Sequence, residues 1–215
     1  MLAVLKENES PEDIIGVLGF IPFRRFDPAS HHSELSLAIW RIRDDAGSPG
    51  LGLLLLKTIE RIYHPSMVIV VGISESIRSI YSVLGYTLGR LSQAALFGHR
   101  VPEHPVVFGV EDWMRQPRED TNGARLLPVG PHELQKWRRR IDELGDVVAP
   151  RKSTTYLQNR FSRHQYYEYD LRGVEIKGTL QAILVLRRVA VPDCGAAAAI
   201  LRIVDMIGND AAIKH

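Results

Sequence analysis

The hydrophobic pattern at the start of the chain predicts β-structure. Three apolar runs, at residues 1–7, 14–23 and 34–42, are rich in β-forming residues, and the turn-forming segment NESPED separates the first two. In the third run, ELSLAIWRI, Leu35, Leu37 and Ile39 share one face at a period of two. Ser36, Ala38 and Trp40 occupy the opposite face.

Helical patterns follow the third run and alternate with strands. GLGLLLLKTIERIYH (50–64) predicts a helix that stops before Pro65, and MVIVVGIS (67–74) predicts a strand buried on both faces. SESIRSIYSVLGY (74–86) predicts a second helix, capped by Ser74 and ended by Gly85, with one more strand after it. The strand–helix–strand order implies a right-handed crossover between parallel strands.

The second half of the chain is separated by a polar segment. EDWMRQPREDTNG (111–123) is charged, contains Pro117 and an Asn-Gly pair, and indicates a linker or long loop. Beyond it we expect a helix from Pro131 to Leu144, a helix ending near His164 followed by a strand, and two further strands at 178–191 and 197–208. The sequence therefore predicts an α/β (α+β) chain with one domain at 1–112 and a second at 123–215.

Composition restricts the class of protein. The hydrophobic fraction of 45% is that of an ordinary globular chain, and no apolar run is long enough to span a membrane. We expect a cytoplasmic protein without a signal peptide, because Cys194 is the single cysteine and leaves no internal disulfide. Residues 1–120 carry 12 Lys and Arg against 15 Asp and Glu, and the remainder carries 15 against 10. This density of basic residues falls short of a nucleic-acid-binding protein, and no nucleic-acid motif is present.

Three glycines precede the first predicted helix. The loop Gly47-Ser48-Pro49-Gly50-Leu51-Gly52 has two interpretations. Glycine backbone and the unpaired N–H groups of a helix start can cradle a phosphate. The same glycines can also form a tight turn that only starts the helix.

Two motifs, in order, resemble the GCN5-related N-acetyltransferase (GNAT) family, whose members use acyl-CoA. The family loop has Arg or Gln, two variable residues, Gly, one variable residue, then Gly or Ala; Gly50 and Gly52 match it, and Gly47 replaces the Arg or Gln. The second motif is an aromatic residue four positions before a Gly-aromatic pair, here Tyr81 to Tyr86. The resemblance covers residues 1 to about 99 and implies an acetyltransferase-like mixed sheet.

The resemblance implies a CoA site and its residues. The diphosphate of acetyl-CoA, or of another acyl-CoA, would lie on the loop Gly47–Gly52, and the pantetheine would pair with the edge of the third strand at Ile39, Trp40 and Arg41. Ser74 stands where the family commonly has an asparagine that touches the cofactor.

Catalytic roles are implied for two residues. Tyr81 matches the general acid that protonates the departing thiolate; the alternative is a half-buried aromatic that packs on the sheet. Glu34 matches a frequent position of the base that deprotonates the acceptor amine; the alternative is a solvated carboxylate at the strand end. His31 and His32 could bind a metal, but adjacent histidines chelate poorly and we expect a solvated loop and no metal. Cys194 has no neighbouring base and indicates a loop thiol.

The second half resembles the beginning of the same fold. We expect a tandem, truncated pair of acetyltransferase-like domains, or two halves that complete each other. Arg160, Arg163 and His164 could contact an anionic acceptor or form a structural cluster. The resemblance suggests an enzyme that transfers an acetyl group to a small-molecule amine, such as an amino sugar. The alternative is a non-catalytic module that binds a ligand or partner; a homo-oligomer is possible in either case.

Overall fold

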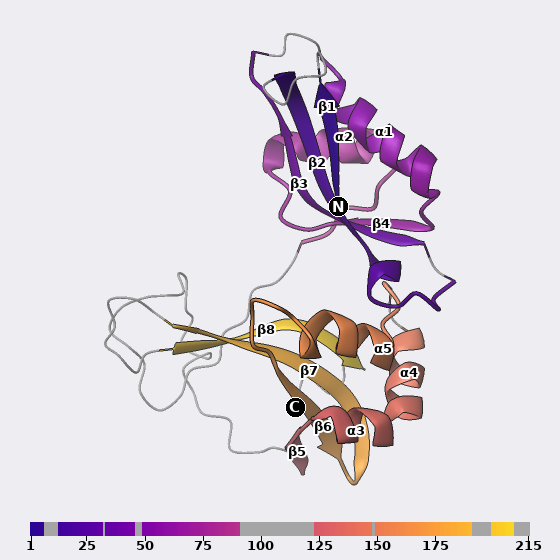
Figure 1. Cartoon of the computed structure of the whole chain (residues 1–215), viewed down its shortest axis with the longest axis vertical. Coiled ribbons are helices and arrows are strands. Elements are labelled where there is room, and N and C mark those ends of the chain that lie inside the picture. Colours follow the sequence, from indigo (N-terminus) through magenta and orange to yellow (C-terminus); the bar gives the residue numbers. More distant parts are fainter. Residues whose placement is uncertain are drawn as a thin grey trace. The chain divides into compact units, whose positions relative to one another are not determined.

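The computed structural model describes residues 1–6, 13–31, 33–45, 49–90, 123–147, 149–190 and 199–208 (Figure 1). The chain divides into two compact units, Met1–Leu88 and Gly89–His215. Each unit has its own four-stranded sheet with helices. The chain therefore has the α+β fold class expected from its sequence. The strand expected after the second helix, and most of the predicted linker, lie outside the described residues.

The first unit contains four strands in the order β1-β2-β3-β4. β1 (Leu2–Lys6), β2 (Ile14–Pro22) and β3 (Glu34–Ile42) form antiparallel neighbours, and β4 (Met67–Val70) lies parallel to β3. Helix α1 (Leu51–Tyr63) connects β3 to β4 and so forms the predicted crossover between two parallel strands.

A β-bulge in β3 changes which residues face the core. Gly19 of β2 pairs with Ile39 and Phe20 pairs with Leu37, so Ala38 is the additional residue. Leu35 and Leu37 are buried before the bulge, whereas Trp40 and Ile42 pack on the core after it and Ile39 is 62% exposed. The alternation predicted for this strand is therefore wrong beyond Leu37, because one inserted residue exchanges the two faces.

The core of the first unit lies between its sheet and α1. It consists of buried aliphatic and aromatic side chains from both, namely Leu18, Phe20, Leu35, Leu37, Leu55, Leu56 and Ile59. α1 starts after Gly50, whose φ is +92°, and His64 caps its end in a left-handed conformation. The leucine-rich run therefore forms the expected helix, with one face buried.

β4 is shorter and more exposed than predicted. It ends at Val70, and Val71 is 65% exposed where the sequence suggested a strand buried on both faces. Gly72 follows with a φ of +76°, a conformation that ends an extended strand. Helix α2 (Glu75–Val83) then begins at Ser74 and ends before Gly85, whose φ is +83°. Both predicted boundaries of this helix are confirmed.

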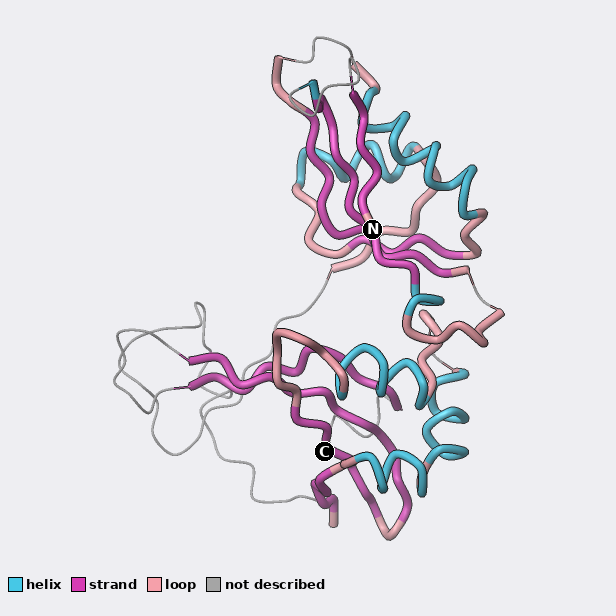
Figure 2. Tube along the Cα trace, viewed as in Figure 1, coloured by secondary structure: helices cyan, strands magenta, loops and turns pink. Residues whose placement is uncertain are grey.

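The second unit has an antiparallel sheet in the order β5-β6-β7-β8. Its strands are β5 (Ala124–Pro128), β6 (Asp170–Ile176), β7 (Thr179–Ala190) and β8 (Ala199–Gly208). Its helices are α3 (Pro131–Lys136), α4 (Arg138–Asp146) and α5 (Thr154–Leu157), the last continued by a π-turn at Gln158–Ser162. Figure 2 shows these helices gathered on the same side of the sheet.

The predicted helix Pro131–Leu144 is two helices. α3 ends at Lys136 and α4 starts at Arg138, with Trp137 (φ −99°, ψ 9°) outside the α-helical range between them. Leu134, Ile141 and Leu144 are nevertheless all buried, because the break keeps the apolar positions on one side.

β7 and β8 continue beyond the rest of their sheet. The last pair between β6 and β7 joins Asp170 to Leu186, after which residues 187–190 pair only with β8 among the residues that the structure describes. Figure 1 shows these strand ends projecting away from α3 and α4. We call residues 187–190 and 199–204 the β7–β8 arm.

Candidate functional site

The first unit opens where β3 and β4 separate. The two strands pair over four positions, from Glu34 opposite Met67 to Leu37 opposite Val70. From Ala38 to Ile42, β3 pairs only with β2 among the described residues. Its main-chain groups on the other side are therefore available to an extended ligand along Ile39–Arg41.

Gly50 immediately precedes α1, the helix that follows β3 in the chain. Gly47 and Ser48 lie outside the described residues, whereas Pro49 and Gly50 are exposed immediately before α1. A Cβ placed on Gly50 would have no atom within 4 Å, so one side of this backbone faces open space. Its left-handed φ explains why a glycine occupies the position.

Gly52 has a different neighbour. A Cβ at Gly52 would lie 2.8 Å from Nε1 of Trp40 and 3.1 Å from Cε2 and Cζ2 of the same ring. The indole therefore packs directly on the first turn of α1. Gly52 is required by packing against β3, and Gly50 is the glycine that a ligand can approach.

The start of α1 carries uncompensated positive potential. The helix has no side-chain cap at Gly50 and no acidic residue in its first turn. The N–H groups of a first helical turn have no partner within the helix, and the helix dipole adds positive potential there. This end of α1 therefore suits an anion such as a diphosphate.

Trp40 also connects the helix start to Tyr81. The Trp40 and Tyr81 rings lie 5.9 Å apart edge to face, and Tyr81 and Tyr86 lie 5.1 Å apart. Tyr81 is only 2% exposed, so it is more buried than the half-buried aromatic of the packing alternative, and burial raises the pKa of its hydroxyl. The Tyr86 hydroxyl donates a hydrogen bond of 2.8 Å to Glu60 of α1.

Glu34 lies toward the other end of β3. Its exposure of 6% excludes the solvated carboxylate that was the alternative for this residue. Trp40 lies six positions further along the strand, roughly 20 Å away in an extended conformation. The structure therefore places Glu34 and the aromatic group around Tyr81 toward opposite ends of β3. Ser74 is exposed at the start of α2, where its hydroxyl lies 3.0 Å from that of Ser76.

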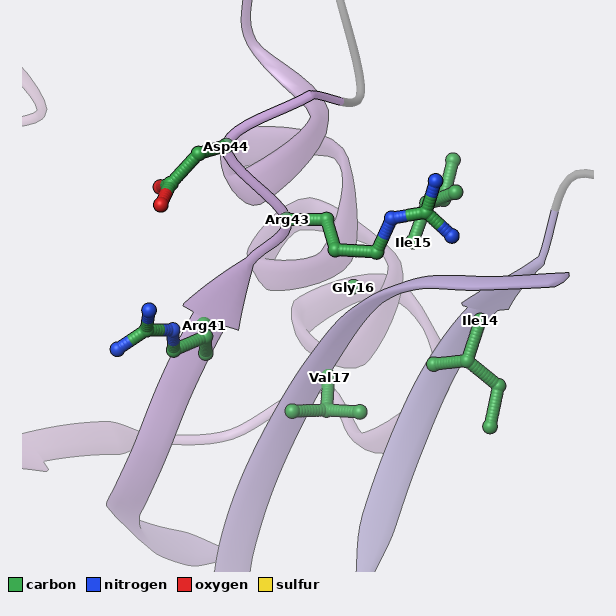
Figure 3. Close-up of a pocket in the computed structure, with 7 residues that line it drawn as sticks. All are labelled: Ile14, Ile15, Gly16, Val17, Arg41, Arg43 and Asp44. Carbon is green, nitrogen blue, oxygen red and sulfur yellow. The ribbon is translucent and has the colours of Figure 1, made fainter. Parts of the chain in front are cut away.

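A shallow hollow opens at the ends of β2 and β3 (Figure 3). Ile14–Val17 form one side, and Arg41, Arg43 and Asp44 form the other. Arg43 is bound to Asp45 by hydrogen bonds of 2.7 and 2.9 Å, and Figure 3 shows its side chain extending away from that of Arg41. The charged groups do not converge on one point, so the hollow lacks the polar arrangement of a ligand pocket.

A metal site is not formed in the part of the chain that the structure describes. No group of three metal-binding side chains occurs there, His31 is exposed, and His32 and Cys194 lie outside the described ranges. None of the described helices is long and apolar enough to cross a bilayer.

The second unit holds a charged network that the sequence did not predict. Lys152 pairs with Asp205 of β8, and the Tyr156 hydroxyl donates a hydrogen bond of 2.8 Å to the same carboxylate. Arg160 bonds to the Tyr156 hydroxyl and lies over the Phe161 ring at 5.3 Å. Arg160 therefore belongs to a structural cluster. The only signal in the sequence was a carboxylate inside the apolar strand IVDMI.

His164 organises the loop beside this cluster. Its Nδ1 accepts hydrogen bonds from the backbone N–H groups of Tyr166 (3.2 Å) and Tyr167 (3.1 Å). Its ring lies 5.1 Å from that of Tyr167 and 5.3 Å from that of Tyr169. His164 is thus a structural residue of the loop, and Arg163 is exposed.

Comparisons with known proteins give structural likenesses but no match of sequence. No protein-family model matches the sequence, and no curated protein matches it. The solved structure of Saccharomyces cerevisiae N-myristoyltransferase with bound myristoyl-CoA is similar at 8% sequence identity and a TM-score of 0.41. The alignment covers 96% of this chain and 52% of that chain, so this chain spans about half the length of the enzyme.

Proposed function

We propose that the first unit binds an acyl-CoA where β3 and β4 separate and transfers its acyl group to an amine. The observation that carries this proposal is that β3 at Ile39–Ile42 pairs only with β2 among the described residues, and that Trp40 of the same segment packs on the uncapped first turn of α1. An extended chain with amides and a terminal diphosphate has the chemistry to fit both features. Acetyl-CoA is the acyl-CoA that the sequence resemblance favours.

Each part of the ligand would meet a different group. The pantetheine amides would pair with the main chain at Ile39–Arg41, and the diphosphate would accept hydrogen bonds from N–H groups of the first turn of α1. The thioester supplies the activated acyl group, which an amine attacks directly. Tyr81 would protonate the departing thiolate; burial raises the pKa of its hydroxyl, which makes the phenol a weaker acid than a free tyrosine and counts against this role.

The position of Glu34 favours a second candidate function. A base far from Tyr81 would have to reach the amine through water, and Gly47 and Ser74 already depart from the family pattern. The alternative is therefore a module that binds an acyl-CoA or a related ligand without catalysis. An amino sugar as the acceptor rests on the family resemblance.

A change of one charge beside the helix start tests acyl-CoA binding. Pro49 is exposed next to Gly50, so Pro49→Glu adds a carboxylate without filling the site, and Pro49→Gln adds the same shape without charge. Repulsion of a doubly charged diphosphate at a separation of roughly 6 Å in water costs on the order of 1.4 kcal/mol, about tenfold in Kd. Isothermal titration calorimetry with acetyl-CoA measures this change.

We expect wild type and Pro49→Gln to bind equally and Pro49→Glu to bind about tenfold more weakly, with the difference shrinking at high salt. The thermal stability of Pro49→Glu should not fall, since a carboxylate near a helix start is favourable. Absence of acetyl-CoA binding by the wild-type chain would reject the proposal. Binding without turnover of any amine would leave the non-catalytic module.

A further inference from the structure

At residues 187–190 and 199–202 the β7–β8 arm is a two-stranded ribbon that does not pair with β6 among the described residues, and Ile203 lies at its base opposite Leu186. Arg187 pairs with Arg202, Arg188 with Leu201, and Val189 with Ile200, with no pairing to β6. A two-stranded ribbon buries little apolar surface and is only marginally stable alone. The side chains on such an arm are therefore displayed to the surroundings.

The arm exposes large aliphatic side chains. Leu201 and Ile203 are each 58% exposed, and Val204 is 40% exposed. Leu201 and Ile203 share one face of β8, whereas Arg202 between them lies on the other face, opposite Arg187. Exposed apolar side chains that lie close together mark contact with a partner or a membrane more often than isolated apolar residues do.

The arm is also basic. Arg187 and Arg202 lie directly opposite each other on neighbouring strands, and two like charges in this arrangement repel each other. Neither they nor Arg188 form an ion pair with a carboxylate in the described part of the chain. Glu168, which lines a hollow with Arg187 and Arg188, forms no ion pair with them there. An external anion would relieve the repulsion.

Two tyrosines stand at the base of the arm. The guanidinium of Arg187 lies 4.7 Å from the centre of the Tyr167 ring, which joins the arm to the loop held by His164. Tyr166 is 84% exposed and Tyr167 is 52% exposed. Tyrosine combines an apolar ring with a polar tip, and it is enriched where protein meets the lipid headgroup region.

We propose that the β7–β8 arm binds the surface of a bilayer containing anionic lipids. Leu201 and Ile203 would enter the boundary of the acyl chains, the arginines would meet the phosphates, and the tyrosines would lie among the headgroups. A nucleic acid would use the arginines and tyrosines but leave the aliphatic side chains in water. A second copy of the chain would bring further arginines into the same contact.

Vesicle flotation of the full chain tests the proposal. We expect binding to vesicles of phosphatidylcholine with phosphatidylglycerol, weak binding to phosphatidylcholine alone, and a decrease with rising salt. Changing Arg187, Arg188 and Arg202 together to glutamine should weaken partition roughly 100-fold, from about 1 kcal/mol per arginine. Leu201→Thr with Ile203→Thr should weaken it about tenfold or more.

Matched variants in the first unit serve as controls. Ile62 and Val83 are 63% and 88% exposed, so Ile62→Thr with Val83→Thr removes the same kind of surface elsewhere and should leave vesicle binding unchanged. Circular dichroism melting verifies that all variants fold. If an arm variant unfolds, Leu201→Trp in the otherwise intact chain should still show a blue shift of emission on anionic vesicles.

Several results would overturn the proposal. The first is that the wild-type chain does not bind anionic vesicles. The second is that Leu201→Thr with Ile203→Thr binds them as well as wild type does. The third is that the chain binds a single-stranded oligonucleotide more tightly than it binds vesicles. If light scattering showed that wild type is a dimer and that Leu201→Thr with Ile203→Thr is a monomer, the arm would be a self-association surface instead. An unshifted Leu201→Trp emission would exclude insertion.

Discussion

Replacing Gly52 by alanine should destabilise the first unit through Trp40. The added Cβ would lie 2.8 Å from the indole nitrogen and 3.1 Å from two ring carbons, whereas ordinary contacts begin at 3.4 Å. The ring has little room to retreat, because it packs edge to face on Tyr81, which is itself 2% exposed. Overpacking of this kind costs about 1–3 kcal/mol, and the helix propensity of alanine returns up to about 1 kcal/mol.

We therefore expect Gly52→Ala to lower the free energy of unfolding by about 1–2 kcal/mol. In a Trp40→Phe background the ring is smaller, so most of this cost should disappear. The coupling free energy between Gly52→Ala and Trp40→Phe should therefore be about 1 kcal/mol. Gly50→Ala is the matched control. It also costs stability, through a φ of +92°, but its Cβ meets no atom within 4 Å and its cost should not depend on Trp40.

Urea unfolding followed by far-ultraviolet circular dichroism measures all of these variants, since it does not depend on the tryptophan being removed. A coupling between Gly52 and Trp40 below about 0.3 kcal/mol, with the folded structure intact, would refute the packing role of Gly52. If Gly52→Ala lost acetyl-CoA binding while its stability stayed unchanged, Gly52 would be a residue of the ligand site and not a packing residue.

Three further outcomes are expected. Tyr81→Phe should leave acetyl-CoA affinity and melting temperature near normal and lower kcat roughly 100-fold on a confirmed amine; unchanged kcat would remove Tyr81 from the mechanism. Lys152→Met should lower the free energy of unfolding, measured in urea, by about 3 kcal/mol, because it leaves the mostly buried Asp205 carboxylate without its cation. Adding Asp205→Asn removes the unpaired charge and should recover part of this loss. Burial opposes ionisation of Glu60, but hydrogen bonds from a lysine and Tyr86 outweigh it and lower the pKa of this carboxyl group. The stability that comes from this lowered pKa is fully present above the pKa of the unfolded chain, about 4.3, and is lost as the pH falls through the pKa of the folded protein. Tyr86→Phe removes one of the hydrogen bonds that lower the pKa. Its urea midpoint should therefore fall less between pH 6 and pH 3 than the midpoint of wild type.

Most elements could be predicted because local patterns determine them. β3 has the predicted boundaries, and α1 and α2 agree with theirs, since leucine periodicity and Gly85 act over a few residues. Ser74 stands at the expected first position of α2, but its hydroxyl lies against Ser76 and does not cap the helix. The orientation of Ile39 could not be predicted, because the bulge at Ala38 depends on pairing with β2, distant in sequence. The extent of β4 was overestimated since an apolar run does not reveal whether neighbouring strands cover it.

The candidate site was predictable only in part. The sequence located the glycines before α1 and the tyrosine motif, but not that Trp40 fills the space at Gly52 and connects both motifs. Such a contact joins β3, α1 and α2, and no local spacing encodes it. The same holds for Lys152 and Asp205, which form a direct ion pair although they are 53 positions apart in the sequence.

The bulge at Ala38 divides β3 into two segments that selection can alter separately. From Glu34 to Leu37 a substitution acts on the packed interior and on pairing with β4, so it is expressed as a change in folding. Beyond Ala38, Ile39 and Arg41 turn outward and contribute little to the interior. Deletion of Ala38 would leave Leu37 opposite Phe20 and Ile39 opposite Gly19, so the two segments would join into one regular strand with Trp40 still on the core face and Arg41 still outward; the extra residue can therefore be gained or lost without exchanging the two roles.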